Sequence, residues 1–416
     1  MKKTRFIRVF CIIVAALLPS FFPSYACSEE DTLVLVGMKS GMNQANAVSA
    51  YNRSAYVADR IDGVWVIDYS DPSEPASLTH YPEITNDIEI RDALAYLVGD
   101  CLSINRIMDP LQPETLGFCC CYDNHLKMHL FDDLALTMLG TPTGECYMVL
   151  TDVSDPYHPE ALSITPPDPY GTQWGGDAFK MGNYVLWADA AFLPEQGTYG
   201  GRIIVLDITD PGSPLSVTID TCLRAQPHAI RIKDDYAYVA EGYGGRGLMV
   251  LNVSDPQNID SAGCFPIAGG EAWNVHLQGN YAYVCAHFQP TFGPDRIYVL
   301  DISDPSSPTL MAAYDTPGPP QDVFVDEPYV LVVEPNSLLI LEANFLDMSG
   351  DVNGDGKVDI GDVVIILNYL FRHGALPNSA IQADVNGDCE ISLEDAIYLL
   401  NYLFKAGNPP EIGCAF

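Results

Sequence analysis

Basic residues are scarce in this sequence. Its 416 residues include 20 Lys and Arg against 55 Asp and Glu, which gives a formal net charge of −35 at pH 7. A protein that binds nucleic acid neutralises phosphates with Lys and Arg, so this balance excludes nucleic acid as an expected partner. The acidity suits either a protein that works among divalent cations or simply one that must stay soluble.

Long apolar runs are also missing. A transmembrane helix needs about 20 consecutive apolar residues, and no stretch of the chain reaches that length. The run at residues 9–18 follows four basic residues and precedes Ser24-Tyr25-Ala26, a small-x-small motif. This order predicts a signal peptide over residues 1–26, cleaved after Ala26, and a secreted or extracellular protein without a transmembrane segment. Cys27 would then begin the mature chain, which leaves a lipid-anchored, cell-surface form as an alternative.

Signatures of catalysis are missing as well. The sequence has no nucleophile elbow, phosphate-binding glycine loop, HExxH helix or CxxC pair. No motif in the sequence indicates a particular reaction, so we assign no catalytic residue and no organic cofactor. We therefore favour a binding protein over an enzyme.

Cysteines, in contrast, are not scarce, and a secreted protein can use them in disulfides. Eleven of the 12 cysteines follow the predicted signal peptide. The run Cys119-Cys120-Cys121 lacks a partner pair at zinc-ligand spacing. We therefore expect disulfides from this run to Cys101 or Cys146 rather than a metal site.

The middle of the chain repeats itself. A strand that ends in Asp or Asn runs into Ser-Asp-Pro or Thr-Asp-Pro five times, about every 40 to 55 residues. The five copies are residues 66–72, 150–156, 205–211, 250–256 and 299–305. The wider gap after the first copy leaves room for one degenerate copy around residues 102–116. Asp and Ser in these turns bond nearby backbone groups and Pro presets the turn, so we expect a structural role for them.

An alternating strand with an Ala-Tyr-Val-like core precedes most of these turns. Such cores occupy residues 54–58, 95–98, 236–240 and 281–284, whereas helical periodicity is nearly absent before residue 350. The repeats resemble the LVIVD family, which implies a mainly β protein with a seven-bladed β-propeller over residues 27–346. The last unit, residues 323–343, lacks the turn. We expect the strand at residues 32–37 to complete that blade and close the ring.

Each inner strand of the expected propeller begins near a polar residue. The seven residues are Asn46, Asp87, His125, Asp177, His228, Asn274 and Asp322. Because corresponding positions of successive blades converge on one mouth of the channel, they either form a site for a carbohydrate or protein ligand or only hold water. In the first case, Trp174 and Trp273 are available for stacking on a sugar.

Near the end of the sequence an acidic loop pattern occurs twice, 33 residues apart, and each copy runs into a segment that ends Leu-Asn-Tyr-Leu-Phe. Oxygen-bearing residues at loop positions 1, 3, 5 and 12 suit Ca²⁺, which takes six to eight oxygens. Position 7 contributes its main-chain carbonyl, and position 9 often binds through water. The predicted metal ligands are Asp351, Asn353, Asp355, Lys357, Asp359 and Asp362 in the first loop and Asp384, Asn386, Asp388, Glu390, Ser392 and Asp395 in the second.

A loop followed by a helix, without an entering helix and with Asp at position 12, resembles a type I dockerin over residues 350–410. The resemblance implies a small all-α domain that binds calcium and a cohesin partner. It places recognition at loop positions 10 and 11 and on the following helix face, which would fall here on Ile360, Gly361, Leu393 and Glu394. The second loop has Cys389 where the sharp turn usually has Gly, so its calcium site is either weakened or supported by a disulfide to Cys414.

These features together predict a secreted, calcium-dependent interaction protein. Its propeller would be a binding module that the dockerin attaches to a cohesin-bearing scaffold or cell-surface partner. The alternative is a dockerin-bearing glycoside hydrolase or polysaccharide lyase in polysaccharide catabolism. The channel mouth separates the two hypotheses. Asp177, His228 and Asp322 could act there as acid, base or metal ligand, and hydrolysis of a glycoside needs two carboxyl groups about 5 to 9.5 Å apart.

Overall fold

The computed structural model describes the chain from residue 33 onward, with several gaps. The described residues are 33–120, 125–140, 146–166, 176–193, 198–220, 223, 225–242, 247–289, 291–343, 350–353, 358–372, 374, 380–388, 390–405, 407 and 410.

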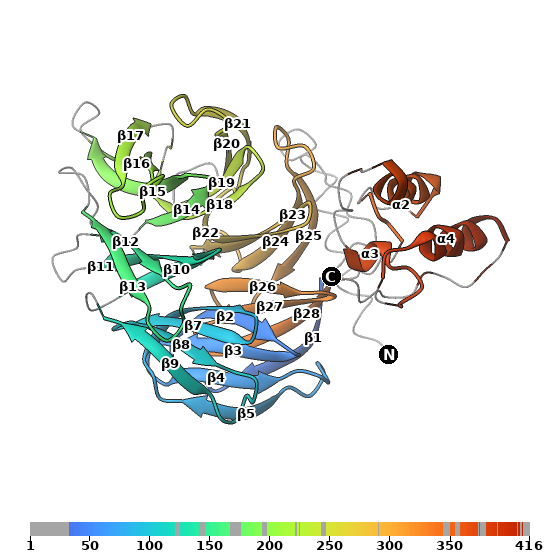
Figure 1. The fold of residues 1–416 in the computed structure, drawn as a ribbon, viewed down its shortest axis with the longest axis horizontal. Coiled ribbons are helices and arrows are strands. Elements are labelled where there is room, and N and C mark those ends of the chain that lie inside the picture. Colours follow the sequence, from blue (N-terminus) through green and yellow to red (C-terminus); the bar gives the residue numbers. More distant parts are fainter. Residues whose placement is uncertain are drawn as a thin grey trace.

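Seven four-stranded antiparallel sheets, the blades, are arranged in a ring (Figure 1). Blade 1 contains β2 (Ala45–Tyr51), β3 (Ser54–Asp59), β4 (Gly63–Asp68) and β5 (Ala76–Tyr81), and blade 2 contains β6 (Thr85–Arg91), β7 (Leu94–Gly99), β8 (Leu102–Arg106) and β9 (Glu114–Cys119). Blade 3 contains β10 (His125–Phe131), β11 (Leu134–Gly140), β12 (Cys146–Asp152) and β13 (Glu160–Thr165), and blade 4 contains β14 (Asp177–Met181), β15 (Tyr184–Leu193), β16 (Thr198–Asp207) and β17 (Leu215–Asp220). Blade 5 contains β18 (Pro227–Lys233), β19 (Tyr236–Glu241), β20 (Leu248–Asn252) and β21 (Asp260–Phe265), and blade 6 contains β22 (Gly270–Gln278), β23 (Tyr281–Phe288), β24 (Arg296–Asp301) and β25 (Thr309–Asp315). Blade 7 contains β26 (Asp322–Asp326), β27 (Tyr329–Glu334), β28 (Ser337–Ala343) and, from the other end of the sequence, β1 (Leu33–Ser40).

The seven-bladed propeller and its closure are therefore confirmed. β1 pairs antiparallel with β28, with Leu33 opposite Ala343 and Ser40 opposite Ser337. The degenerate repeat forms β8 and β9 of blade 2. The innermost strands contact one another in turn from β2 to β26, and β26 contacts β2 again. Joining the two ends of the propeller in one blade leaves no blade of the ring incomplete.

The repeated Asp residues fold the turn between the last two strands of a blade. The carboxylate of Asp68 accepts hydrogen bonds from the backbone N–H and the hydroxyl of Ser70, and Asp71 does the same for Ser73. These bonds to Ser70 lower the pKa of Asp68 below its ordinary value. Equivalent bonds recur in the other copies, which agrees with the structural role expected for these residues.

Apolar residues from alternate positions of the strands fill the interfaces between blades. The tyrosines of the Ala-Tyr-Val cores lie in these interfaces, where Tyr56, Tyr238 and Tyr283 are almost completely buried. They pack between blades and are not exposed for stacking on a ligand. A disulfide joins Cys101 to Cys120, which is one of the two pairings expected from the sequence. Cys146, the other expected partner, is a buried free thiol.

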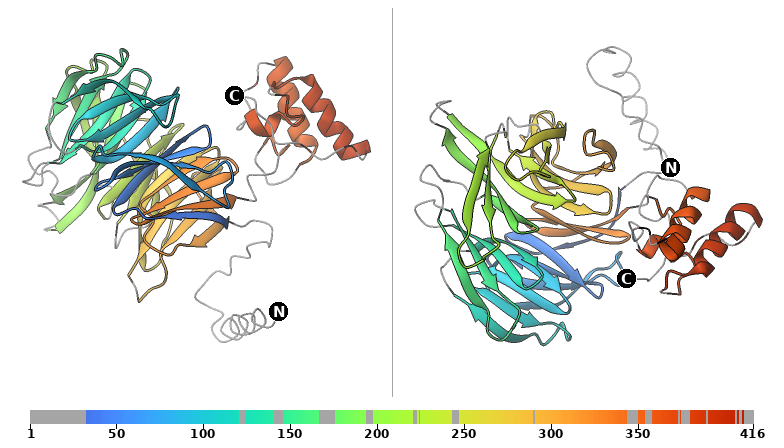
Figure 2. Two further views of the ribbon diagram at one scale, coloured as in Figure 1. Left: turned by 90° about the horizontal axis from the view of Figure 1, so that it is seen from below. Right: turned by 45° about the horizontal axis from the view of Figure 1, so that its top comes forward.

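The helices form a separate group after the last blade (Figure 2). They are α2 (Ile360–Arg372), α3 (Ala380–Ala383) and α4 (Leu393–Lys405). α2 and α4 pack together over a small apolar core that includes Val363, Ile366, Ala396 and Leu399. Within the described part of the chain, none of the helices has both the length and the apolar character required to cross a membrane.

Candidate functional site

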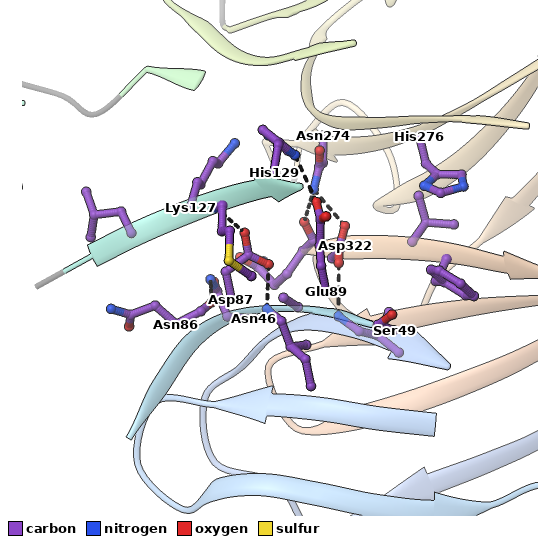
Figure 3. Close-up of a pocket in the computed structure, with 18 of the residues that line it drawn as sticks. Asn46, Ser49, Asn86, Asp87, Glu89, Lys127, His129, Asn274, His276 and Asp322 are labelled. Carbon is purple, nitrogen blue, oxygen red and sulfur yellow. Dashed lines mark hydrogen bonds and ion pairs between the residues drawn. The ribbon is translucent and has the colours of Figure 1, made fainter. Parts of the chain in front are cut away.

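The inner strands of the propeller present two rings of polar side chains to the central channel (Figure 3). The first ring lies near the start of these strands and includes Asp87, Lys127, Asn274 and Asp322, while Asp177 at the corresponding position of β14 is completely buried. The second ring lies two residues later on the strands, on the same face, and includes Ser49, Glu89, His129, Arg231 and His276.

Carboxylates of the first ring connect neighbouring blades. One oxygen of Asp87 accepts a hydrogen bond from the backbone N–H of Met128 in the next blade, at 2.8 Å. Asp177 accepts one from Ile230 at 3.1 Å, and Asp322 accepts one from Val48 at 2.9 Å. An inner strand is the edge strand of its blade, so the N–H groups on its unpaired edge need acceptors from outside the sheet. These three Asp residues supply them, which gives each a structural role.

A buried ionic network crosses four blades. The imidazole of His129 lies between Glu89, at 3.1 Å, and Asp177, at 2.8 Å. Arg231 also donates to Asp177 at 2.8 Å, and the Lys127 ammonium lies 3.7 Å from the same carboxylate. Asp177 is completely buried, and a buried charge is tolerated only when it is paired with opposite charges. The network therefore joins blades 2 to 5 around one fixed carboxylate.

The pKa values in this network follow from burial and charge. Burial opposes the ionisation of Asp177, but the charges of Lys127, His129 and Arg231 outweigh it and hold its pKa well below the ordinary value. Burial and Arg231 disfavour the charged form of His129, yet Asp177 and Glu89 outweigh them and raise its pKa. Asp177 is thus held as an anion and is unsuited to act as a general acid.

Asp87 and Asp322 differ from Asp177, because no cationic group of the described residues lies within ion-pair distance of either carboxylate. Burial raises the pKa of Asp87 to about 7, and the charges of Asp322 and Glu89 add to this effect. Burial also raises the pKa of Asp322. Two carboxylates in one channel disfavour each other's ionisation.

The paired loops have the same construction. In the first loop, the carboxylate of Asp362 accepts from the backbone N–H groups of Asn353, at 3.0 Å, and Asp359, at 2.8 Å. In the second loop, Asp395 accepts from the equivalent N–H groups of Asn386, at 3.3 Å, and Ser392, at 2.8 Å. The carboxylate at position 12 therefore closes each loop onto the start of its helix.

The residues at loop position 9 cap the helices. Asp359 accepts a hydrogen bond from the Gly361 N–H at the start of α2, and Ser392 accepts one from the Glu394 N–H at the start of α4. Such caps satisfy backbone donors that lack a partner within the helix. The same side chains thus have a structural role in addition to the role predicted for them in binding calcium.

The donor set of the loops fits a hard cation. Four predicted ligands are buried carboxylates with at most 3% exposure, namely Asp351, Asp362, Asp384 and Asp395. Asn353, Asn386, Asp388 and Glu390 also lie on the described parts of the loops, whereas Asp355, Lys357, Cys389 and Cys414 lie outside them. The described residues alone hold no cluster of three or more His, Cys, Asp or Glu arranged for a metal. Carboxylate, amide and main-chain oxygens are the ligands that Ca²⁺ takes.

Comparison with protein families agrees with both parts of this description. The model of the LVIVD repeat matches residues 43–82, 227–263 and 269–316, and the model of the dockerin type I domain matches residues 349–404. The chain carries LVIVD repeats and a type I dockerin domain. No curated protein matches the sequence.

Solved structures resemble the chain in fold. A computationally designed protein named Ika8 aligns with a TM-score of 0.51 and 10% identity over 76% of this chain and 100% of its own length. A chain of a mitotic checkpoint complex aligns with a TM-score of 0.54 and 8% identity over 78% of this chain and 97% of its own. At such identities the likeness concerns the propeller architecture alone.

On the dockerin domain, α2 and α4 expose matching apolar residues. Ile360, Val364 and Phe371 of α2 are 51%, 48% and 66% exposed. Their counterparts 33 residues later on α4, Leu393, Ile397 and Phe404, are 46%, 48% and 69% exposed. We call these six residues the apolar stripes. Of the recognition positions expected from the sequence, Ile360 and Leu393 are part of them.

Most of the predicted channel residues meet, with a shift in register. Asn46, Asp87, His228, Asn274 and Asp322 line the channel, whereas Asp177 is completely buried and does not line it. Asn46 and His228, however, are extra residues at β-bulges, one position before the first ring. His125 begins β10, but its side chain lies outside the described part, as does Trp174. Trp273 is covered by His228 and His287, with ring centroids 4.4 and 4.8 Å away, which leaves it poorly placed to stack on a sugar.

Sequence reasoning missed the second ring and Lys127. Glu89, His129, Arg231 and His276 each follow a first-ring position by two residues, which is the period of one face of a strand. Applying that period to each inner strand would have found them.

Proposed function

We propose that this chain is a secreted, calcium-dependent interaction protein in which the dockerin domain binds a cohesin and the propeller is the module that it attaches. The proposal takes residues 1–26 as a signal peptide, residues 27–346 as the propeller and residues 350–410 as the dockerin domain. The observation that carries it is the duplication of one loop-and-helix construction, down to the carboxylates of Asp362 and Asp395. The contacts of Asp177 give no support to the enzyme alternative, since this carboxylate is fixed in an ion-pair network.

Calcium would be held by six residues of each loop. These are Asp351, Asn353, Asp355, Lys357, Asp359 and Asp362 in the first loop and Asp384, Asn386, Asp388, Glu390, Ser392 and Asp395 in the second. When bound, the ion would neutralise carboxylates that the fold buries close together. Because Asp362 and Asp395 also fix the first turn of α2 and α4, loss of calcium would loosen both helices.

The apolar stripes would form the surface for the cohesin. Exposed Leu, Ile and Phe residues on adjacent helices provide the apolar centre that specific interfaces contain. The two stripes come from equivalent positions, so each offers the same kind of contact. Neither the loops nor the propeller channel presents a comparable group of exposed apolar side chains among the residues described at these sites.

Binding of the full chain to a panel of type I cohesin domains, measured with calcium and with a chelator, tests this proposal. We expect binding only with calcium, and a loss of at least tenfold in affinity when Val364 and Ile397 are both changed to Asp. The matched control is Ile219→Asp, which alters an exposed apolar residue of the propeller. Equal binding by the stripe variant and the control, or binding that ignores calcium, would contradict the proposal.

A further inference from the structure

The propeller channel encloses a cavity of about 770 Å³ that is separate from the dockerin domain. This volume lies within the range of about 300 to 1,000 Å³ that is usual for small-molecule sites. Phe179 and Phe324, which occupy second-ring positions of blades 4 and 7, give its wall apolar surface, and the two polar rings supply a limited number of polar groups. Apolar walls with a few converging polar groups are typical of a ligand site.

Two cations of the rings are already occupied. Lys127 donates to the main-chain oxygen of His228 at 2.5 Å and lies beside Asp177. Arg231 donates to Asp177 and to the main-chain oxygen of Ile230, both at 2.8 Å. These groups satisfy the fully buried carboxylate and the backbone, so the described residues of the rings offer no free cation to bind an anion.

Two carboxylates of the first ring remain without a cation among the described residues. Asp87 accepts from the backbone N–H groups of Ile88 and Met128. Asp322 accepts from the Val48 N–H and from the side-chain amide of Asn274, at 2.8 Å. Each carboxylate oxygen can accept more than one hydrogen bond, so both keep capacity toward the cavity that they line.

A third acceptor lies on the blade between them. Asn46 of blade 1 is flanked by Asp322 of blade 7 and Asp87 of blade 2 (Figure 3). Its amide nitrogen donates to the main-chain oxygen of Asn86 at 2.8 Å, which directs that nitrogen toward blade 2 and leaves the amide oxygen as an acceptor. Three consecutive blades thus contribute two anionic acceptors and one neutral acceptor along the same arc of the channel.

We propose that this arc binds the protonated amine of a small molecule, with Asp87, Asp322 and Asn46 accepting its three N–H donors and the apolar wall contacting its carbon skeleton. A primary ammonium has three donors and no acceptor, which matches this set. A positive charge offsets the burial that raises the pKa of both carboxylates, and it relieves the charge repulsion that raises the pKa of Asp87 further. A neutral sugar fits less well, because the faces of Trp273 are covered by His228 and His287.

Two matched ligand pairs test the proposal on the full chain at pH 7, where both amines are mostly protonated, in saturating calcium. Phenethylamine is compared with 2-phenylethanol, and glucosamine with glucose, by calorimetry. Within each pair only the amine can place a cation between the carboxylates. We expect phenethylamine to bind at least tenfold more tightly than 2-phenylethanol, and any binding of glucosamine to exceed that of glucose. Equal affinities for an amine and its neutral partner, or no binding of either amine at millimolar concentration, would overturn the proposal.

Variants locate the site. Asp322→Asn and Asp87→Asn each remove one negative charge and keep an acceptor for the backbone N–H of the next blade, so we expect at least a tenfold loss in amine affinity. Glu114→Gln makes the same change of charge on the outer strand β9 and should leave the affinity unchanged. Asn46→Ala, which keeps both carboxylates, should give a smaller loss. If Asp87→Asn and Asp322→Asn both bind the amine as the parent does, the assignment is wrong.

Discussion

Replacing Asp87 with Asn should make the propeller more stable at pH 8 and leave its stability nearly unchanged at pH 4. The folded protein raises the pKa of this carboxyl from 3.8 to about 7, through burial and then through the charges of Asp322 and Glu89. A carboxyl with a raised pKa favours folding while it is protonated. Its contribution is therefore fully present below pH 3.8 and is lost as the pH rises through about 7.

The size of the effect follows from the same shift. A change of about 3 pKa units corresponds to about 4 kcal/mol between the two protonation states. Asp87 is only partly buried and faces a cavity, so solvent screening reduces this figure, and we expect about 2 kcal/mol at pH 8. The amide introduced by the substitution can still accept the hydrogen bond from the Met128 N–H through its oxygen.

Urea unfolding followed by tryptophan fluorescence measures this prediction. All four tryptophans precede residue 344, so their signal reports on the propeller. Asp177→Asn is the matched control with the opposite sign, because it removes the anion that pairs with His129 and Arg231. Breaking such a buried network costs about 3 to 5 kcal/mol. If Asp87→Asn lowers stability at pH 8, or if its gain is the same at pH 4 and pH 8, the electrostatic reasoning is refuted.

Two further predictions concern other parts of the chain. Ser392→Ala removes the cap of α4 and should lower the stability of the dockerin domain by about 1 kcal/mol, measured by helical circular dichroism during calcium-free thermal unfolding. Ser392→Asp restores an acceptor and should recover this stability. No difference between the two variants would refute the role of the cap. Changing both Cys101 and Cys120 to Ser opens a disulfide that spans 19 residues and should lower the stability of the propeller in urea unfolding by about 3 kcal/mol. The control Cys146→Ser changes a free thiol, so it separates the loss of the crosslink from the change of side chain. A double variant as stable as the parent would contradict this expectation.

The number of blades could be predicted because every repeat unit has its own strands and most also have the turn. The closing strand β1 could also be predicted, since a blade that lacks its fourth strand must take it from elsewhere. The register of the channel was less accessible. Bulges insert Asn46, His228 and Trp273 into their inner strands and shift the following residues by one position. Such insertions depend on contacts with the neighbouring strand, which local sequence does not record.

The partners of the polar residues could not be predicted either. Asp87 and Asp177 occupy equivalent positions and have the same side chain, yet only Asp177 is surrounded by cations. The difference comes from His129 on blade 3 and Arg231 on blade 5, which are 48 and 54 residues distant in the sequence. The calcium ligands, in contrast, follow from a local pattern, and they stay a prediction until calcium binding is measured.

Calorimetric titration of the full chain with calcium measures whether the two loops bind the ion. We expect two sites in the parent protein, one site after Asp362→Asn or Asp395→Asn alone, and none after both changes together. Asp326→Asn, which alters a carboxylate of the propeller, should leave both sites intact. A parent chain that takes up no calcium, or a double variant that titrates as the parent does, would contradict the assignment of the loops and with it the calcium-dependent attachment of the propeller.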